Sequence, residues 1–211
     1  MNVRINGKAP NFTARTTEGT IDLHKWMGTS WVFLFSHPAD FTPVCTTELG
    51  QVARMKRDFD KRDVKVLGLS VDNLDDHKRW LRDIEATQGV KLNFPVIADP
   101  DRRVADIYGL IEGNGEIMTT GRAALVIDPD KKVRLTINYP ETTGRNFNEI
   151  LRAIDSLQLH SRYDVATPAN WVPGDDVILS PSISERDAKK LYPNGYTEHT
   201  HYLRTASVPA R

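Results

Sequence analysis

Short apolar runs rich in β-branched and aromatic residues recur along the chain, separated by stretches with helical spacing. Runs of roughly four to eight such residues between turn signals are typical of buried strands. We therefore predict strands over residues 30–36, 64–71, 94–98, 123–127 and 133–139. Proline presets one turn dihedral, and glycine or asparagine accepts a positive φ, so we predict turns at residues 99–101, 113–115 and 128–130.

Three longer segments repeat their apolar residues at helical spacing, over residues 46–62, 74–85 and 146–158. The second follows Asp72 and Asn73, two residue types that cap helices. The third has a continuous apolar stripe, which should pack on the face of a sheet. This stripe consists of Phe147, Ile150, Leu151, Ile154 and Leu157. Strands that alternate with helices in this way predict an α/β fold.

The pattern changes after Leu159, where the chain is interrupted by Pro168, Pro173, Pro181 and Pro193 and only residues 184–192 have helical spacing. We expect a main domain over residues 1–158 and a C-terminal extension over residues 159–211. Trp171 and Tyr192 are large aromatic residues of this extension. They predict that the extension docks against another surface instead of trailing free.

Charge and composition exclude several classes of function. The 28 lysines and arginines balance the 28 aspartates and glutamates without a block of one sign, so nothing predicts binding to nucleic acid or stable membrane association. The longest apolar run, residues 31–35, is too short to span a bilayer, and the N-terminus lacks the apolar stretch of a signal peptide. A single cysteine excludes an internal disulfide framework and favours a reducing compartment. We expect a soluble, cytoplasmic protein.

The single cysteine, Cys45, follows a predicted strand and a loop with two prolines, and it stands where a helix begins. Unpaired N–H groups and the positive end of the helix dipole favour a thiolate there, and the thiolate is the nucleophilic form. A lone cysteine is more commonly a small buried apolar residue, so this context is what favours a reactive thiol. Dithiol chemistry of the thioredoxin type requires a second cysteine three residues away, where this chain has Thr42.

The segment over residues 35–50 resembles the active-site signature of peroxiredoxins, Pro-x-x-x-Thr-x-x-Cys, with Pro38, Thr42 and Cys45 at the motif positions. Arg122 matches the arginine of that family's site. Similarity to the one-cysteine, peroxiredoxin-6-like branch continues through residues 139–147, 167–171, 174–176 and 191–193, so it covers nearly the whole chain. The resemblance implies a thioredoxin-like fold, a central mixed sheet flanked by helices.

The resemblance also implies an activity, that of an antioxidant peroxidase which reduces hydrogen peroxide and organic hydroperoxides through a cysteine sulfenic acid. Cys45 would attack one peroxide oxygen. Arg122 would stabilise the thiolate and the leaving oxygen, the Thr42 hydroxyl would hold the peroxide, and Pro38 would keep water away from the sulfur.

Further residues and partners follow from the same resemblance. Glu48 and Arg145 would orient Arg122, and His37 would assist at the edge of the pocket, although solvated ion pairs and structural histidines are common alternatives. No cofactor or metal is expected, because the pair His199 and His201 lacks a visible third ligand. With one cysteine per chain, turnover requires an external thiol such as glutathione or thioredoxin. The branch also implies a homodimer or a larger homo-oligomer.

Two alternatives compete with the peroxidase. Some members of this branch are reported to add phospholipase A2 activity at a Gly-x-Ser-x-Gly serine, and Ser30, with His24 and Asp130 as partners, matches that pattern in part. Valine occupies the place of the second glycine, and a bulky β-branched residue does not suit the sharp turn of such an elbow. The other alternative is a binding protein or holdase that has lost catalysis, against which the complete set of motif residues argues.

Overall fold

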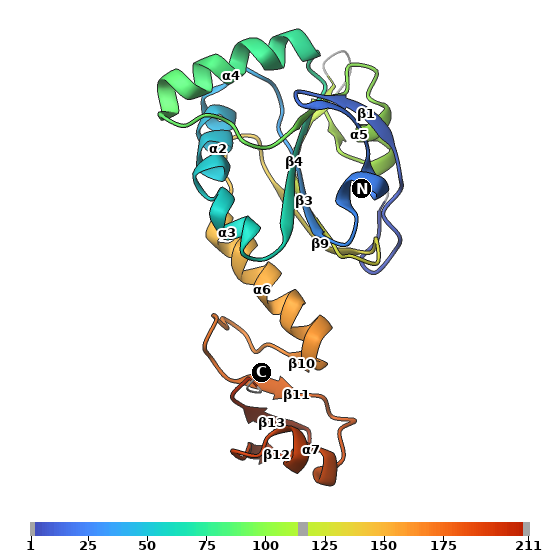
Figure 1. The fold of residues 1–211 in the computed structure, drawn as a ribbon, viewed down its shortest axis with the longest axis vertical. Coiled ribbons are helices and arrows are strands. Elements are labelled where there is room, and N and C mark those ends of the chain that lie inside the picture. The colour runs from blue at the N-terminus through green and yellow to red at the C-terminus, as the bar shows by residue number, and fades with distance from the viewer. Residues whose placement is uncertain (1–2, 114–117, 209–211) are drawn as a thin grey trace. The chain divides into compact units, whose positions relative to one another are not determined.

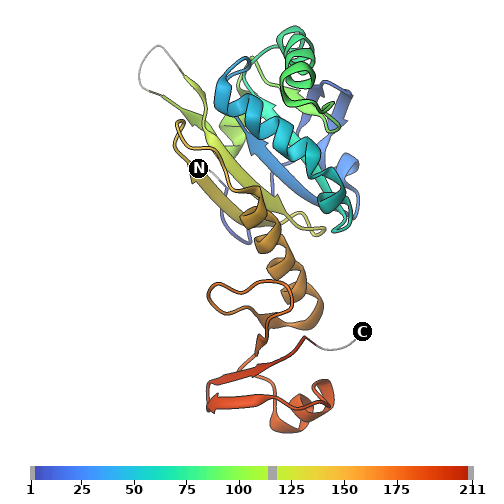
Figure 2. The ribbon, with the colours of Figure 1, turned by 90° about the vertical axis from the view of Figure 1, so that its left-hand side faces the viewer.

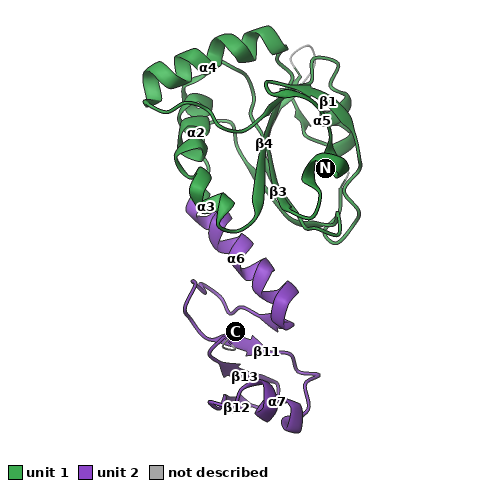
Figure 3. Ribbon diagram, viewed as in Figure 1, with its two compact units in different colours: residues 1–147 green, residues 148–211 purple. Residues whose placement is uncertain are grey.

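The computed structural model describes residues 3–113 and 118–208 and divides into two compact units between Phe147 and Asn148 (Figure 3). Among the described residues, no helix is long and apolar enough to cross a membrane. The predicted turns at 99–101 and 128–130 are confirmed, since each is closed by a backbone hydrogen bond of 2.9 Å. The predicted turn at 113–115 lies partly outside the described residues.

The first unit is built on a seven-stranded sheet with the order β2-β1-β5-β4-β3-β8-β9 (Figure 1). The neighbours β3, β4 and β5 run parallel and the remaining pairs antiparallel, so the sheet is mixed as predicted. Its strands are β1 (Thr13–Thr16), β2 (Gly19–Asp22), β3 (Trp31–Ser36), β4 (Val64–Ser70), β5 (Val96–Ala98), β8 (Arg122–Ile127) and β9 (Val133–Tyr139). A separate hairpin pairs β6 (Ile111–Glu112) with β7 (Thr119–Thr120).

Helices cover both faces of this sheet (Figure 1). One face carries α2 (Pro43–Arg54), α3 (Lys56–Asp60) and α4 (Leu74–Gln88), and the other carries α1 (Leu23–Met27) and α5 (Arg103–Tyr108). The five predicted strands and the predicted helix at residues 74–85 are all present, with ends shifted by up to three residues. The predicted α/β class is therefore confirmed.

Strand β3 shows why the centre of the sheet is apolar throughout. All six of its residues are buried, because strands flank it on both sides and helices cover both faces. Val32 and Leu34 belong to the core on the side of α1 and α5. Phe33 and Phe35 stack on each other with ring centres 5.2 Å apart, and Phe147 meets both rings edge-on. Phe147 is the first residue of α6 (Phe147–Tyr163) and of its apolar stripe, and it lies on this face of the sheet.

The predicted helix over residues 46–62 differs from the structure in its start and in its continuity. Helix α2 begins at Pro43, because proline fits the first turn, where its missing N–H would have no helical partner. The helix is interrupted at Met55, whose ψ of 6° departs from helical geometry. A second short helix, α3, then starts at Lys56. Apolar spacing continues through this break, so the pattern alone does not reveal it.

The second unit contains more regular structure than the sequence predicts. After α6 it forms an antiparallel sheet with the order β10-β11-β13-β12, coloured orange to red in Figure 2. The elements are β10 (Val165–Ala166), β11 (Val177–Leu179), α7 (Glu185–Leu191), β12 (Thr197–Thr200) and β13 (Leu203–Ala206). The predicted helix over residues 184–192 is confirmed as α7, which has Ser184 as its N-cap and Tyr192 as its C-cap, whereas the four strands were not predicted. Strands of two to four residues leave too short an alternation to recognise.

The two aromatic anchors of the extension are buried. Tyr192 packs into a small apolar core of the second unit, together with Val177, Leu179 and Ala188. Trp171 is 1% exposed, and its ring N–H donates to the carbonyl of Asp175 at 3.1 Å. The extension therefore has a small apolar core of its own. This core was not predicted from the sequence.

Candidate active site

Cys45 lies in the first turn of α2, directly after the loop that leaves β3. Thr42 is the N-cap residue of the helix, with extended backbone angles, and Pro43 occupies the first helical position. The sulfur therefore belongs to the turn whose backbone N–H groups have no helical partner. The cysteine is fully buried.

The other two motif residues of the loop line the same segment. Pro38 is buried, and Thr42 is half-buried. The Thr42 hydroxyl donates to the carbonyl of Ala39 at 2.9 Å instead of capping the helix. Its hydrogen is therefore committed to the loop, and its oxygen is left with acceptor capacity. Phe41 precedes it with a φ of 56°, a left-handed conformation that is uncommon for an aromatic residue.

Arg122 reaches the cysteine from the start of β8. Its guanidinium Nη1 lies 3.4 Å from the Cys45 sulfur and donates to Oε2 of Glu48 at 2.8 Å. On the other side, Nε donates to the carbonyl of Glu141 at 2.7 Å. The side chain is 2% exposed, so Glu48 and the Glu141 carbonyl hold a buried, charged donor against the sulfur.

Glu48 joins Arg122 to a second buried arginine, Arg145. Arg145 approaches this carboxylate through Nε at 2.9 Å and Nη2 at 2.6 Å, and its backbone N–H donates to the same carboxylate at 2.7 Å. Its Nη1 donates to the carbonyls of Ser36 and Ala123. Burial alone would raise the pKa of Glu48, but the hydrogen bonds and charge of Arg145, with Arg122, outweigh it and hold the pKa below its ordinary value. Glu48 is thus an ionised bridge between two guanidinium groups.

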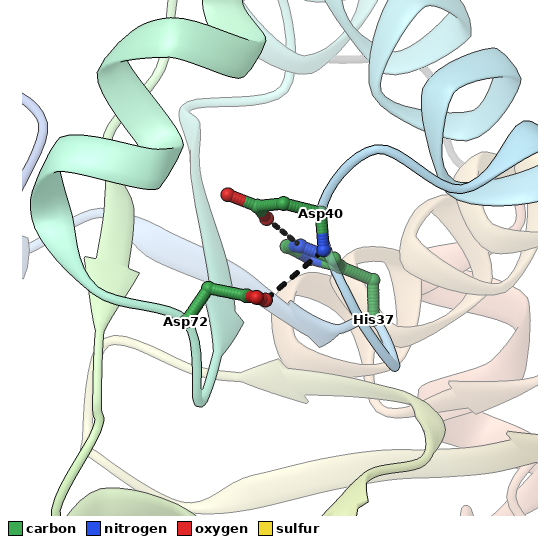
Figure 4. A group of neighbouring side chains, drawn as sticks. All are labelled: His37, Asp40 and Asp72. Atoms are coloured by element: carbon green, nitrogen blue, oxygen red, sulfur yellow. Dashed lines mark hydrogen bonds and ion pairs between the residues drawn. The ribbon is translucent and has the colours of Figure 1, made fainter.

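His37 does not join this cluster. Its Nε2 lies 2.9 Å from Oδ1 of Asp40, while Asp72 accepts from the Asp40 backbone N–H at 3.0 Å (Figure 4). His77 of α4 bonds the other Asp40 oxygen through Nδ1 at 2.6 Å. Trp80, also on α4, has its ring centre 5.1 Å from that of His37. Apart from His37, sequence reasoning missed this network, because Asp40 lies in a loop and its partners come from a distant helix.

The ligand atoms of His37, Asp40 and Asp72 lie within 4.8 Å of one another, the spacing of a metal site. Oδ1 of Asp40 is already bound to the His37 ring (Figure 4). Oδ2 of Asp72 already accepts from the Asp40 backbone and from the Ser70 hydroxyl. The group therefore forms a closed hydrogen-bond network and does not present open ligand positions.

The residues of the phospholipase alternative are not assembled. The Ser30 hydroxyl donates to Oδ1 of Asp63 at 2.7 Å, and Nε2 of His24 bonds the carbonyl of Ala9 at 2.9 Å. Asp130 is exposed in the turn before β9. A nucleophilic serine requires a hydrogen bond to its histidine, and both groups are committed elsewhere.

Two protein families match the chain. Residues 5–136 match the AhpC/TSA family, and residues 156–195 match the C-terminal domain of 1-Cys peroxiredoxin. A 1-Cys peroxiredoxin of Dictyostelium discoideum is 51% identical over 207 residues, which cover 98% of this chain and 86% of that protein. Peroxiredoxin-6 of Gallus gallus is 48% identical over 199 residues, which cover 90% of this chain and 89% of that protein.

Solved structures agree with these relatives. A cysteine-to-serine mutant of peroxiredoxin 6 from Arenicola marina superimposes with a TM-score of 0.92 at 46% identity, covering 99% of this chain and all of that one. A yeast mitochondrial 1-Cys peroxiredoxin, described with a thiol-resolving mechanism via glutathione/thioredoxin systems, gives 0.91 at 46% identity, covering 97% of this chain and 99% of that one. The likeness therefore spans both units.

Proposed function

Since the chain belongs to the peroxiredoxin family and is a thiol-dependent peroxidase, we propose that Cys45 is its peroxide-attacking residue. One observation carries the proposal. The sulfur stands at the first turn of α2 with a buried guanidinium nitrogen of Arg122 at 3.4 Å. A helix N-terminus and an adjacent cation both favour the thiolate.

The proposed reaction is a displacement on the O–O bond of the hydroperoxide. The thiolate of Cys45 forms a bond to one oxygen as the bond between the two oxygens breaks. The departing oxygen carries the electron pair, takes a proton from water and leaves as water or as an alcohol. The sulfur is oxidised to a sulfenic acid and the peroxide is reduced.

Arg122 is the proposed electrostatic catalyst of this step. Negative charge moves from sulfur to the leaving oxygen, and a donor fixed beside the sulfur before the reaction stabilises this charge without reorganising. Glu48 and Arg145 are the proposed positioning residues, because Glu48 binds both guanidinium groups. Two guanidinium charges and one carboxylate leave one positive charge in the cluster, and a thiolate at Cys45 balances it.

Thr42 and Pro38 are the proposed contacts to substrate on the loop side. The Thr42 hydroxyl gives its hydrogen to Ala39, so its oxygen is free to accept the O–H of a hydroperoxide. Pro38 is buried and offers no N–H, which keeps a competing donor away from the sulfur.

A rapid-mixing experiment tests this assignment. The reduced protein is mixed with hydrogen peroxide or an organic hydroperoxide, and loss of the thiol is followed by stopped flow. The parent should lose one thiol per chain, and the Cys45→Ser variant, with no thiol left, should consume no peroxide. Peroxide consumption by Cys45→Ser at the parent rate would show that another group carries the reaction.

The remaining features of the function are proposals of the same kind. Turnover uses an external thiol such as glutathione or thioredoxin, which the single cysteine supports. The free thiol also supports a reducing compartment, and we propose the cytoplasm. We further propose a homodimer or larger homo-oligomer, testable by light scattering, and a functional division between residues 1–158 and 159–211.

A further inference from the structure

A buried row of side chains that the proposed reaction does not use joins the loop between β3 and α2 to helix α4. His37, Asp40 and His77 lie in sequence along two hydrogen bonds, with Asp40 in the middle (Figure 4 shows His37 and Asp40). Their side chains are 0%, 1% and 1% exposed. A buried carboxylate that joins two imidazole rings restricts where protons sit.

His77 must donate from both ring nitrogens. Its Nε2 lies 3.0 Å from the carbonyl oxygen of Ile97, which only accepts, so Nε2 carries a hydrogen. Its Nδ1 lies 2.6 Å from Oδ2 of Asp40, a short contact that contains a second proton. Burial would lower the pKa of His77, but the hydrogen bond and charge of Asp40, aided by the Ile97 carbonyl, hold it above its ordinary value. His77 is therefore an imidazolium paired with the Asp40 carboxylate.

His37 has the opposite state. Its Nε2 donates to Oδ1 of Asp40, whereas its Nδ1 is buried without a hydrogen-bond partner among the described residues. A buried N–H without an acceptor is costly, so Nδ1 carries no proton. Burial lowers the pKa of His37, and the positive charge of His77 lowers it further against the opposing effect of Asp40. The ring is neutral, with its single proton on Nε2.

Among the residues that the structure describes, few other charges act on these two rings. Asp40, from the loop, and Asp72, from the turn between β4 and α4, are the carboxylates that act on both rings. Burial would raise the pKa of Asp40, but the hydrogen bonds from His37 and His77 hold it below its ordinary value. Helix α4 contributes the uncharged ring of Trp80 beside His37. His77 thus supplies the positive charge of this network.

The network is tied to the residues that hold the substrate. The ring of Trp80, beside His37, donates to the Thr46 hydroxyl at 3.1 Å, and that hydroxyl donates to the carbonyl of Thr42 at 2.7 Å. Asp40 itself is anchored through its backbone N–H to Asp72. A change in the charge of His37 or Asp40 therefore acts on the loop from Pro38 to Thr42.

We propose that His77 is a positioning residue of the peroxidase. Its charge keeps Asp40 ionised and His37 neutral, and this fixes the loop that holds the peroxide against Cys45. The inference rests on the proposed function of that loop. Through His77, helix α4 would help to set the pH range over which the enzyme reacts, although it lies far along the sequence from the motif.

Replacement of the histidine tests the role in catalysis. In His77→Gln the positive charge is lost while Asp40 remains, so His37 should take up a proton at a higher pH than in the parent. The rate of the peroxide reaction, measured from about pH 5.5 to about pH 8.5, should match the parent within about twofold at the alkaline end. At pH values below the pKa of His37 in the variant, the ratio of the variant's rate to the parent's rate should fall about tenfold per pH unit. His199→Gln, at an exposed histidine of the second unit, is the matched control and should follow the parent throughout.

A uniform loss at all pH values would reduce His77 to a structural role and overturn the proposal, as would an unchanged profile. Nitrogen-15 NMR of the histidine rings provides a second measurement that needs neither activity nor a variant. In the parent at neutral pH, His77 should show two protonated nitrogens and His37 one, on Nε2. A neutral His77 ring would contradict the inference even if Cys45 proves to be the peroxide-attacking residue. Failure of the parent to react with peroxide would instead count against the proposed function.

Discussion

Two buried arginines share one carboxylate next to the sulfur of Cys45, and this sharing separates their tasks. Arg145 is held by five hydrogen bonds to Glu48 and to two backbone carbonyls, including one from its own N–H, so it is a fixed support. Arg122 makes one contact with the carboxylate and one with the sulfur. Of the two, only Arg122 is expected to act on the reacting atoms.

Arg122→Met should therefore fold and react poorly. Glu48 keeps its pair with Arg145, so the carboxylate is not left unpaired, while the transition state loses its fixed donor. Loss of one such donor typically costs roughly a hundredfold or more in rate. Stopped-flow kinetics should show this loss, with circular dichroism unchanged. Arg57→Met, at an exposed arginine, is the control, and equal rates in the two variants would remove Arg122 from the mechanism.

Glu48→Gln should change how stability depends on pH. The pKa of Glu48 in the folded protein lies below its ordinary 4.5, so its stabilisation is present above that value and is lost as the pH falls through the lower, folded value. At neutral pH the variant leaves two buried guanidinium groups without the carboxylate that they share, and breaking such a buried pair costs roughly 3–5 kcal/mol. Urea unfolding should show that the free energy of unfolding of the variant is well below that of the parent at pH 7. This difference should become smaller in acid. A difference that is constant with pH would mean that Glu48 is not ionised.

At the scale of elements, α4 is bonded to the active-site loop and to α2, since it carries both His77 and Trp80. Its start is fixed by Asn73, whose side-chain oxygen accepts from the N–H groups of Asp75 and Asp76 at 3.0 and 2.9 Å. Of the two predicted caps, Asn73 is thus the one used, and Asp72 is engaged with the loop instead.

Asn73→Ala should destabilise the protein by about 1 kcal/mol, because two N–H groups of the first turn lose their acceptor. The midpoint of urea unfolding measures this loss. Asn73→Asp keeps an acceptor at the same place and should restore most of the stability. If Asn73→Ala and Asn73→Asp unfold at the same midpoint, the cap does not hold the start of α4.

At the scale of the whole molecule, the chemistry is limited by the presence of one cysteine per chain. One equivalent of peroxide should consume one thiol and leave a sulfenic acid that dimedone labels, because no second thiol of the chain is there to condense with it. Mass spectrometry of peroxide-treated protein, with and without dimedone, measures the adduct. If the main product is a disulfide between the Cys45 residues of two subunits, the proposal of an external thiol is wrong and the partner subunit's thiol resolves the sulfenic acid.

The sequence by itself determined the α/β class and the place of Cys45 at the start of a helix, and its single cysteine supports the proposal of an external thiol. These follow from patterns within a few residues, and from a count. The family resemblance indicated Arg122, Glu48 and Arg145 as partners of that cysteine, but local spacing along the chain could not show which distant residues meet. Arg122 meets a sulfur 77 residues away, and His77 meets a carboxylate 37 residues away.

These contacts between distant residues depend on tertiary structure. The antiparallel pairing of β3 with β8 brings Arg122 to the end of β3 where the Cys45 loop begins. The parallel pairing of β3 with β4 likewise places the start of α4 beside that loop. The small sheet of the second unit could not be predicted from the sequence either, because its strands are too short to show alternation. Local spacing encodes helices and strands, whereas strand order and register decide which distant charges share a buried site.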